Sequence, residues 1–251
     1  RRRETPPPVI SGHALDVLAV VVAHFFPSLN RWIDGLQDPR RPEMCSYSLR
    51  HLLWSGLLML LDGAHSRYQH ISDTLTGAFL EALHRLGGCA EETSAHPGTL
   101  HHLMTRMAPS GLHALLVRLV KRLLRMRCLE RFRFGREWLV AVDGTELRQY
   151  PKRHCARCLT RKLSNGKTEY FHSVLEAKLV LGNGMVVSLA SVPLENASGG
   201  YEKQDCELKA FTRLADKLRQ CYPRLPMCIL MDSLFAVEPV FRRCREEGWS
   251  L

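Results

Sequence analysis

The 251-residue sequence has no long apolar segment and little glycine, proline or aromatic residue. Its longest apolar runs, 17–26 and 52–61, are interrupted and fall well short of the roughly 20 residues that span a bilayer. We therefore expect no membrane-spanning helix and no membrane partner. Seventeen glycines and 13 prolines are too few for a collagen-like or low-complexity chain. Nine scattered cysteines do not make the dense disulfide framework of a small secreted domain, so we expect free thiols and a cytoplasmic protein.

Acidic residues are also scarce. The chain has 25 acidic and 35 basic residues, a net charge of +10 and a pI near 9.4, which indicates a polyanionic partner such as nucleic acid. The basic surplus lies mainly in residues 1–136. Near the end of that region, four basic residues at i, i+3, i+4 and i+7 share one face of an expected helix. They are Arg118, Lys121, Arg122 and Arg125. Phosphate contact and an ordinary solvated face both remain open, and we favour phosphate contact because few acids lie nearby.

The sequence changes character near residue 137, which divides it into an expected helical region, 1–136, and a mixed region, 137–251. Apolar residues at three- and four-residue spacing predict helices in the first region, with Ser48 as a helix cap and Pro97-Gly98 as a turn. These helices cover 14–26, 49–61, 71–86, 99–107 and 112–129. The second region predicts strands at 138–142, 170–181, 185–193 and 227–231, and helices at 204–221 and 236–247. Gly182-Asn183-Gly184 indicates a hairpin. The fold class is therefore α+β or α/β, with flanking helices on a mixed sheet.

Two apolar strands end in a carboxylate. Val140-Ala141-Val142 runs into Asp143-Gly144, where we expect the chain to turn, and Ile229-Leu230-Met231 runs into Asp232. Neighbouring strands would bring these carboxylates together at one sheet edge, where ligands gather. Two adjacent like charges repel unless a divalent cation lies between them, and Mg²⁺ or Mn²⁺ prefers oxygen ligands. The alternative is that each Asp is only a turn former or a helix cap.

These motifs resemble those of the DDE transposases of bacterial insertion sequences, which have an RNase H-like catalytic domain. The matching pieces are 142–145, 202–207 and 231–236, in the strand and helix order with which that fold starts. The resemblance implies metal-dependent DNA cleavage and strand transfer, with Asp143 and Asp232 as catalytic metal ligands for Mg²⁺ or Mn²⁺. It also implies double-stranded DNA (element ends and target) as partner, a DNA-binding region in 1–136, a nucleoid-associated bacterial location, and compatibility with a homodimer on DNA. An RNase H-like nuclease and a catalytically dead DNA-binding remnant remain alternatives.

The sequence departs from this family in its third acid, a Glu on a late helix beyond the end of this chain. Glu246 and Glu247 follow Asp232 too closely to replace it, and we interpret them as part of a solvated helix end. We therefore expect a C-terminally truncated chain with an incomplete active site. Asp205 and Glu207 fit the first turn of a helix, where acids are favourable for the helix dipole alone.

A basic loop after the first Asp holds the remaining candidates. Arg153 and Arg157, together with nearby aromatic residues, are expected to guide a DNA strand, although an ordinary exposed loop is equally compatible with them. Cys155 and Cys158 form half of a zinc site, which His154, His172 or Cys206 would have to complete. Because no second Cys pair is present, we favour plain thiols over zinc. His101 and His102 are expected to be partly buried rather than to contact DNA.

Overall fold

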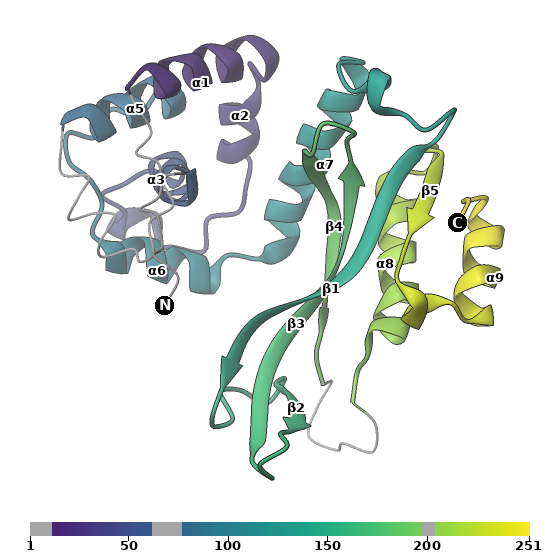
Figure 1. The fold of residues 1–251 in the computed structure, drawn as a ribbon. Helices are drawn as coiled ribbons and strands as arrows, with labels where there is room; N and C mark the ends of the chain where they lie inside the picture. Colours follow the sequence, from purple (N-terminus) through teal and green to yellow (C-terminus); the bar gives the residue numbers. More distant parts are fainter. Residues whose placement is uncertain (1–11, 62–76, 197–203) are drawn as a thin grey trace, which may run out of the picture. The chain divides into compact units, whose positions relative to one another are not determined.

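The computed structural model describes residues 12–61, 77–196 and 204–251. The chain divides into two compact units, Arg1–Leu115 and Leu116–Leu251, and the boundary lies within helix α7. Each unit is described separately below. The N-terminal unit is helical, as expected, and the C-terminal unit combines a sheet with helices (Figure 1).

The N-terminal unit packs around α3, in which Leu52, Leu53, Trp54 and Leu58 are buried whereas Leu57, Leu60 and Leu61 are exposed, as in a helix with one apolar face against a core. Ser48 caps this helix as predicted, since its Oγ accepts a hydrogen bond from the His51 amide (3.1 Å). Asn30 links three helices by accepting a bond from Trp54 Nε1 and donating one to the Leu86 carbonyl, both 2.8 Å long. The helices are α1 (Gly12–Phe25), α2 (Leu29–Asp34), α3 (Leu49–Leu61), α5 (Gly77–Gly87), α6 (Pro97–Arg106) and α7 (Pro109–Arg125), with a 3₁₀ turn at Pro42–Met44.

Most expected helices of this unit are present, with three differences. The short helix α2 was not predicted, and Pro97-Gly98 opens α6 instead of forming a separate turn. The first residues of the helix expected at 71–86 lie outside the described residues, and the rest corresponds to α5. No described helix is both long and apolar enough to cross a bilayer.

The C-terminal unit is built on a five-stranded mixed sheet with flanking helices. β1 pairs antiparallel with β3, which pairs antiparallel with β2 and β4 along its other edge. Along its other edge β1 pairs parallel with β5. Cys228 of β5 in turn forms a parallel bridge with Ser250. The strands are β1 (Trp138–Tyr150), β2 (Leu159–Lys162), β3 (Thr168–Val180), β4 (Val186–Leu194) and β5 (Met227–Leu230).

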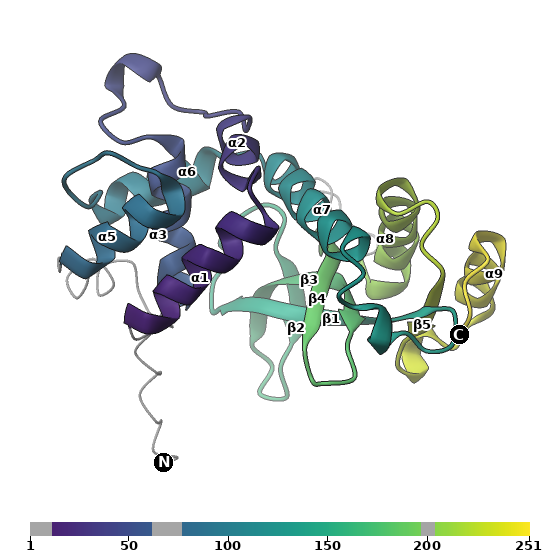
Figure 2. The same cartoon turned by 90° about the horizontal axis from the view of Figure 1, so that it is seen from above.

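One face of the sheet is covered by α8 (Glu207–Cys221) and α9 (Glu238–Glu247), which Figure 2 shows on the same side of the strands. The helix α8 forms there because Ala210, Phe211, Leu214 and Leu218 make one apolar stripe, and all four are buried. The buried side chains of β1, β3 and β4 pack into the same core. This helix therefore has a fixed position over the sheet, with its first turn near the middle of β1.

Two features of the sheet differ from the prediction. β1 does not turn at Gly144 but continues as a strand to Tyr150, and β2 was not predicted. Together with the first part of β3 they form a long ribbon that extends past the rest of the sheet (Figure 1). Most of this part of β1 is exposed, so the apolar pattern that identified the strand stops at Val142 although the pairing continues. The hairpin at Gly182-Asn183-Gly184 is present, between β3 and β4.

Candidate carboxylate site and clusters of metal-ligand type

Asp143 and Asp232 lie on neighbouring parallel strands at the same level. The last residues paired between β1 and β5 are Ala141 and Leu230. Asp143 follows Ala141 by two residues, and Asp232 follows Leu230 by two residues. Both carboxylates are exposed at the carboxyl ends of this strand pair. Asp143 Oδ1 accepts a bond from the Gly144 amide (2.8 Å) and Asp232 Oδ1 from the Leu234 amide (3.0 Å). Asp232 thus caps the 3₁₀ turn Ser233–Phe235.

The structure adds a third carboxylate, Glu207, in the first turn of α8. Gly144 explains how it fits, because a Cβ built on Gly144 would lie 1.9 Å from Glu207 Oε1 and 2.6 Å from its Cδ. The glutamate side chain therefore occupies the space that the glycine leaves open beside β1. The sequence interpretation of Glu207 as a helix-terminal acid describes its position in the helix but misses this contact with the strand.

The three carboxylates influence one another electrostatically. Burial raises the pKa of Glu207, and the charges of Asp143 and Asp232 raise it further. This like-charge effect places Glu207 in the field of both aspartates. Two other groups of three in the described residues already have their ligand atoms within 4.8 Å of one another, and the carboxylates are not among them. Carboxylates brought close to one another repel, and a divalent cation between them would offset that repulsion.

Two other acids of the C-terminal unit have structural roles instead. Asp205 forms an ion pair with Arg213 (2.5 Å), and its Oδ2 accepts a bond from the Glu195 amide. Glu247, expected on a solvated helix end, is only 12% exposed and pairs with Arg219 and Arg243. That expectation was wrong because α9 packs against α8, which carries Arg219. Glu246 is exposed.

Two of the four basic residues expected on one face of α7, Lys121 and Arg122, are partly buried. Val117 and Val120 face the core of the C-terminal unit, and the Lys121 ammonium lies 6.0 Å from the Tyr222 ring centroid. Arg118 and Arg125 are exposed, whereas Arg122 is half-buried. Their side chains therefore flank the buried stripe of the helix, and those of Arg118 and Arg125 point to solvent.

Part of the positive charge on the ribbon is neutralised. Arg161 pairs with both Glu146 (2.7 Å) and Glu169 (2.5 Å), and Arg157 lies 3.3 Å from Glu195. Arg153 is exposed and lies over the ring of Tyr170 at 5.6 Å. Of the two ribbon arginines predicted to bind DNA, Arg157 is thus ion-paired with an acid of the same unit.

The Cys-x₂-Cys pair is joined by a histidine from another strand. The sulfurs of Cys155 and Cys158 lie 3.8 Å apart, and His172 Nε2 on β3 lies 3.4 Å from the first and 3.5 Å from the second. Burial opposes ionisation of Cys158, but hydrogen bonds from the amides of Cys155 and His154 outweigh it, so the pKa of this thiol is lowered. His172 was one of three partners left open by the sequence. Cys206 is exposed and is not a member of this cluster.

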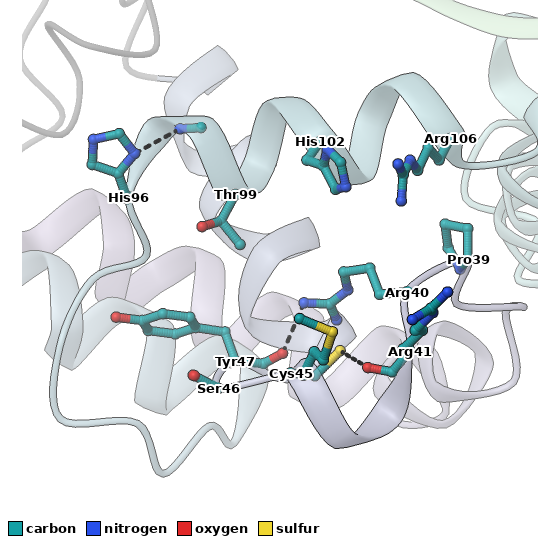
Figure 3. Close-up of a pocket in the computed structure, with 12 residues that line it drawn as sticks. Pro39, Arg40, Arg41, Cys45, Ser46, Tyr47, His96, Thr99, His102 and Arg106 are labelled. Carbon is teal, nitrogen blue, oxygen red and sulfur yellow. Dashed lines mark hydrogen bonds between the residues drawn. The ribbon is translucent and has the colours of Figure 1, made fainter.

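A cavity of about 750 Å³ lies within the N-terminal unit, between α6 and the segment 39–47 (Figure 3). His102 and Arg106 of α6 line one side of it, and Arg40 and Arg41 line the other. Arg40 is held by Asp38 (2.6 Å), whereas Arg41 and Arg106 form no ion pair within the described part of the chain. The expectation of partly buried histidines was wrong, since His101 and His102 are both exposed.

The N-terminal unit contains a second cluster of metal-ligand type. His51 is fully buried, and its Nδ1 lies 3.6 Å from Glu91 Oε2, longer than a hydrogen bond. Burial raises the pKa of the third member, Cys89, to about 11, which favours the protonated thiol over a metal-binding thiolate. Glu91 Oε1 already accepts a bond from the Ser48 amide (2.8 Å). We therefore interpret His51, Cys89 and Glu91 as a buried polar cluster and not as a metal centre.

We expect this cluster to make the N-terminal unit sensitive to acid. Burial lowers the pKa of His51, although Glu91 opposes this, so the unfolded chain binds that proton more readily and stability falls below about pH 6.5. Burial acts to raise the pKa of Glu91, but bonds from Ser48 and the charge of His51 bring it to about 2. Its contribution is present above the ordinary value of 4.5 and is lost as the pH falls from there towards 2.

Urea unfolding of the full chain, followed by tryptophan fluorescence between about pH 7 and pH 4, tests this expectation. His51→Gln should remove the upper part of the pH dependence, whereas His102→Gln, at an exposed histidine of the same unit, should retain it. Equal pH profiles for both variants would show that His51 does not cause the effect.

Comparison with known proteins gives no relative to guide the assignment. No protein-family model matches the chain, and no curated protein matches it.

Proposed function

We propose that the chain is a DDE-type transposase with an RNase H-like catalytic unit, which cleaves and transfers DNA strands with Mg²⁺ or Mn²⁺. The carrying observation is that Asp143 and Asp232 each lie two residues beyond the last paired residues of the parallel strands β1 and β5, with Glu207 beside Gly144. These three carboxylates form an oxygen donor set suited to a hard divalent cation. Such a cation would neutralise charge on the phosphodiester and stabilise the leaving oxygen.

The strand arrangement supports the RNase H-like assignment. Leaving out the short β2, the order is β4-β3-β1-β5, with the first three strands antiparallel and β5 parallel to β1. The helix α8 connects β4 to β5, and α9 leads to the parallel bridge at Ser250 on the far side of β5. This is the three-strand, helix, strand, helix order that the sequence resemblance implies for the start of that fold.

The protein residues have separate roles in this proposal. Asp143 and Asp232 are the principal metal ligands, held in place by the amides that bond one oxygen of each. Glu207 acts as the third carboxylate, and burial and the charges of the two aspartates raise its pKa. The α7 arginines and the cationic cavity of the N-terminal unit contact DNA phosphates.

A nuclease is the second candidate, and Glu207 is the observation that favours it. This residue supplies a third acid from within the described chain, so cleavage does not require a glutamate on a later helix. A catalytically dead DNA-binding remnant would keep the cationic surfaces and show no cleavage.

Incubating the full chain with Mn²⁺ and labelled duplexes distinguishes these functions. The duplexes are taken from the DNA on either side of the coding gene and from an unrelated plasmid. Cleavage confined to the flanking duplexes, with joining of their 3′ ends to plasmid DNA, supports the transposase. Cleavage of every duplex without joining supports the nuclease, and salt-sensitive binding without cleavage supports the remnant.

We expect Arg106→Ala to reduce the salt dependence of DNA binding. Each phosphate that a cation neutralises contributes about 0.9 to the slope of log K against log salt, so this slope should fall by about 1. The control is Arg85→Ala, because Arg85 is already paired with Asp16 and Glu81. Fluorescence anisotropy over a range of salt concentrations measures both. An unchanged slope for Arg106→Ala would remove the cavity from the DNA-binding surface.

A further inference from the structure

The cysteine–histidine cluster of the ribbon has the geometry of a zinc site. In such sites Zn–S bonds are about 2.3 Å and Zn–N bonds about 2.0–2.1 Å, with tetrahedral angles. These bond lengths require edges of about 3.8 Å between two sulfurs and about 3.5 Å between sulfur and nitrogen. The observed edges are 3.8 Å between Cys155 and Cys158, and 3.4 and 3.5 Å from their sulfurs to His172 Nε2. One ion can therefore lie at bonding distance from all three atoms without a change in the backbone.

The surroundings hold these atoms in place. Cys158 is fully buried and Cys155 and His172 are half-buried, so the site is enclosed on one side and open on the other. The Cys155 amide donates to Cys158 Sγ (3.3 Å), as expected around a thiolate ligand. His172 is fixed by the pairing of β3 with β1, in which it lies opposite Arg148. The fourth position of a tetrahedron is left to water or to His154, whose ring lies 6.4 Å from that of His172.

We propose that Cys155, Cys158 and His172 bind a zinc ion that fastens the loop between β1 and β2 to β3. This site is separate from the carboxylates and does not depend on the proposed catalytic function. Sulfur and imidazole ligands select zinc over Mg²⁺, so the two kinds of metal are distinguished by ligand chemistry.

The zinc-bound loop also supports the start of α8. The Cys158 carbonyl accepts a bond from Asn196 Nδ2 (3.0 Å), and the Asn196 side-chain oxygen accepts one from the Asp205 amide (3.4 Å). Gln204 adds bonds to the amide and carbonyl of Thr160 (2.6 and 2.8 Å). The loop is thus joined by hydrogen bonds to the residues that lead into Glu207.

Zinc content of the purified full chain tests the proposal. We expect one zinc per chain after growth with Zn²⁺ and dialysis, measured by mass spectrometry of the metal. The cobalt-substituted protein should show the visible bands of a tetrahedral Co²⁺ site and a sulfur-to-cobalt charge-transfer band. Cys155→Ser and His172→Gln should weaken Zn²⁺ affinity by more than about 10- to 100-fold, which is the loss typical of changing a residue behind the ligands.

Two controls identify the site. Cys128→Ser changes an exposed thiol, and Cys89→Ser removes the thiol of the His51 cluster. Both should retain one zinc per chain, and circular dichroism of each variant reports whether the chain is folded. Zinc retained in folded Cys155→Ser, zinc lost from folded Cys89→Ser, or a Cys155–Cys158 disulfide in protein purified under reducing conditions would each overturn the proposal. None of these results depends on DNA cleavage, so the zinc site can fail while the catalytic proposal stands.

Discussion

Asp143→Asn and Asp232→Asn are each expected to reduce Mn²⁺-dependent DNA cleavage on the order of 10³-fold, because each replaces a charged metal ligand with a neutral one. Asparagine suits this test since it keeps a side-chain oxygen at the same place. The bonds that Oδ1 accepts from Gly144 in one case and from Leu234 in the other can therefore be retained. The fold should be little affected, and the lost activity then reports the charge itself.

The matched control is Asp216→Asn on α8. Asp216 is an exposed acid of the same unit, lies in the second half of α8, away from Glu207 in the first turn, and pairs with Arg243. An exposed ion pair contributes about 0–1 kcal/mol, so this variant should remain folded and cleave DNA normally. Activity is followed by nicking of supercoiled plasmid, and metal affinity by Mn²⁺ titration. Full activity in both aspartate variants would show that the two strand ends do not form the active site.

The elements that the sequence predicts well are those whose burial alternates or repeats. The apolar stripe of α8 is visible because one face of the helix packs into the core, and the apolar run of β5 is visible because its consecutive residues are buried on both faces. Asp143 and Asp232 could be selected for the same reason, since each ends such a run. That the two aspartates lie at the same level along the neighbouring strands follows from the parallel register of β1 and β5. The sequence alone does not reveal this register.

The features that the sequence does not reveal depend on tertiary contacts. The part of β1 beyond Gly144 is mostly exposed, so pairing with β3 rather than burial makes it a strand. Glu207 looks like any acid in a first helical turn until α8 is placed over Gly144. His172 lies 17 residues from Cys155, and the pairing of β3 with β1 together with the loop between β1 and β2 brings them into contact. In each case a long-range contact selects one residue among several of the same type.

Gly144→Ala is expected to lower cleavage on the order of 10- to 100-fold while the protein stays as stable as the original. The added methyl group would occupy the position of the Glu207 carboxylate, because the Cβ would lie 1.9 Å from Oε1. The backbone at this position is ordinary strand, and the obstructing atoms belong to the flexible end of a side chain. Glu207 therefore moves away from the aspartates instead of the strand distorting, and alanine carries no conformational penalty in a strand.

A double-mutant cycle with Glu207→Gln decides whether the glycine acts through the glutamate. If it does, Gly144→Ala should cause little further loss in a chain that already carries Glu207→Gln, so the two effects are not additive. Gly182→Ala is the control, since a Cβ there meets only Phe132, at 3.9 Å. Single-turnover cleavage rates and urea unfolding are measured for all four chains of the cycle. Additive losses would mean that Gly144 matters for another reason, and wild-type activity in Glu207→Gln would leave Asp143 and Asp232 as the only carboxylates of the site.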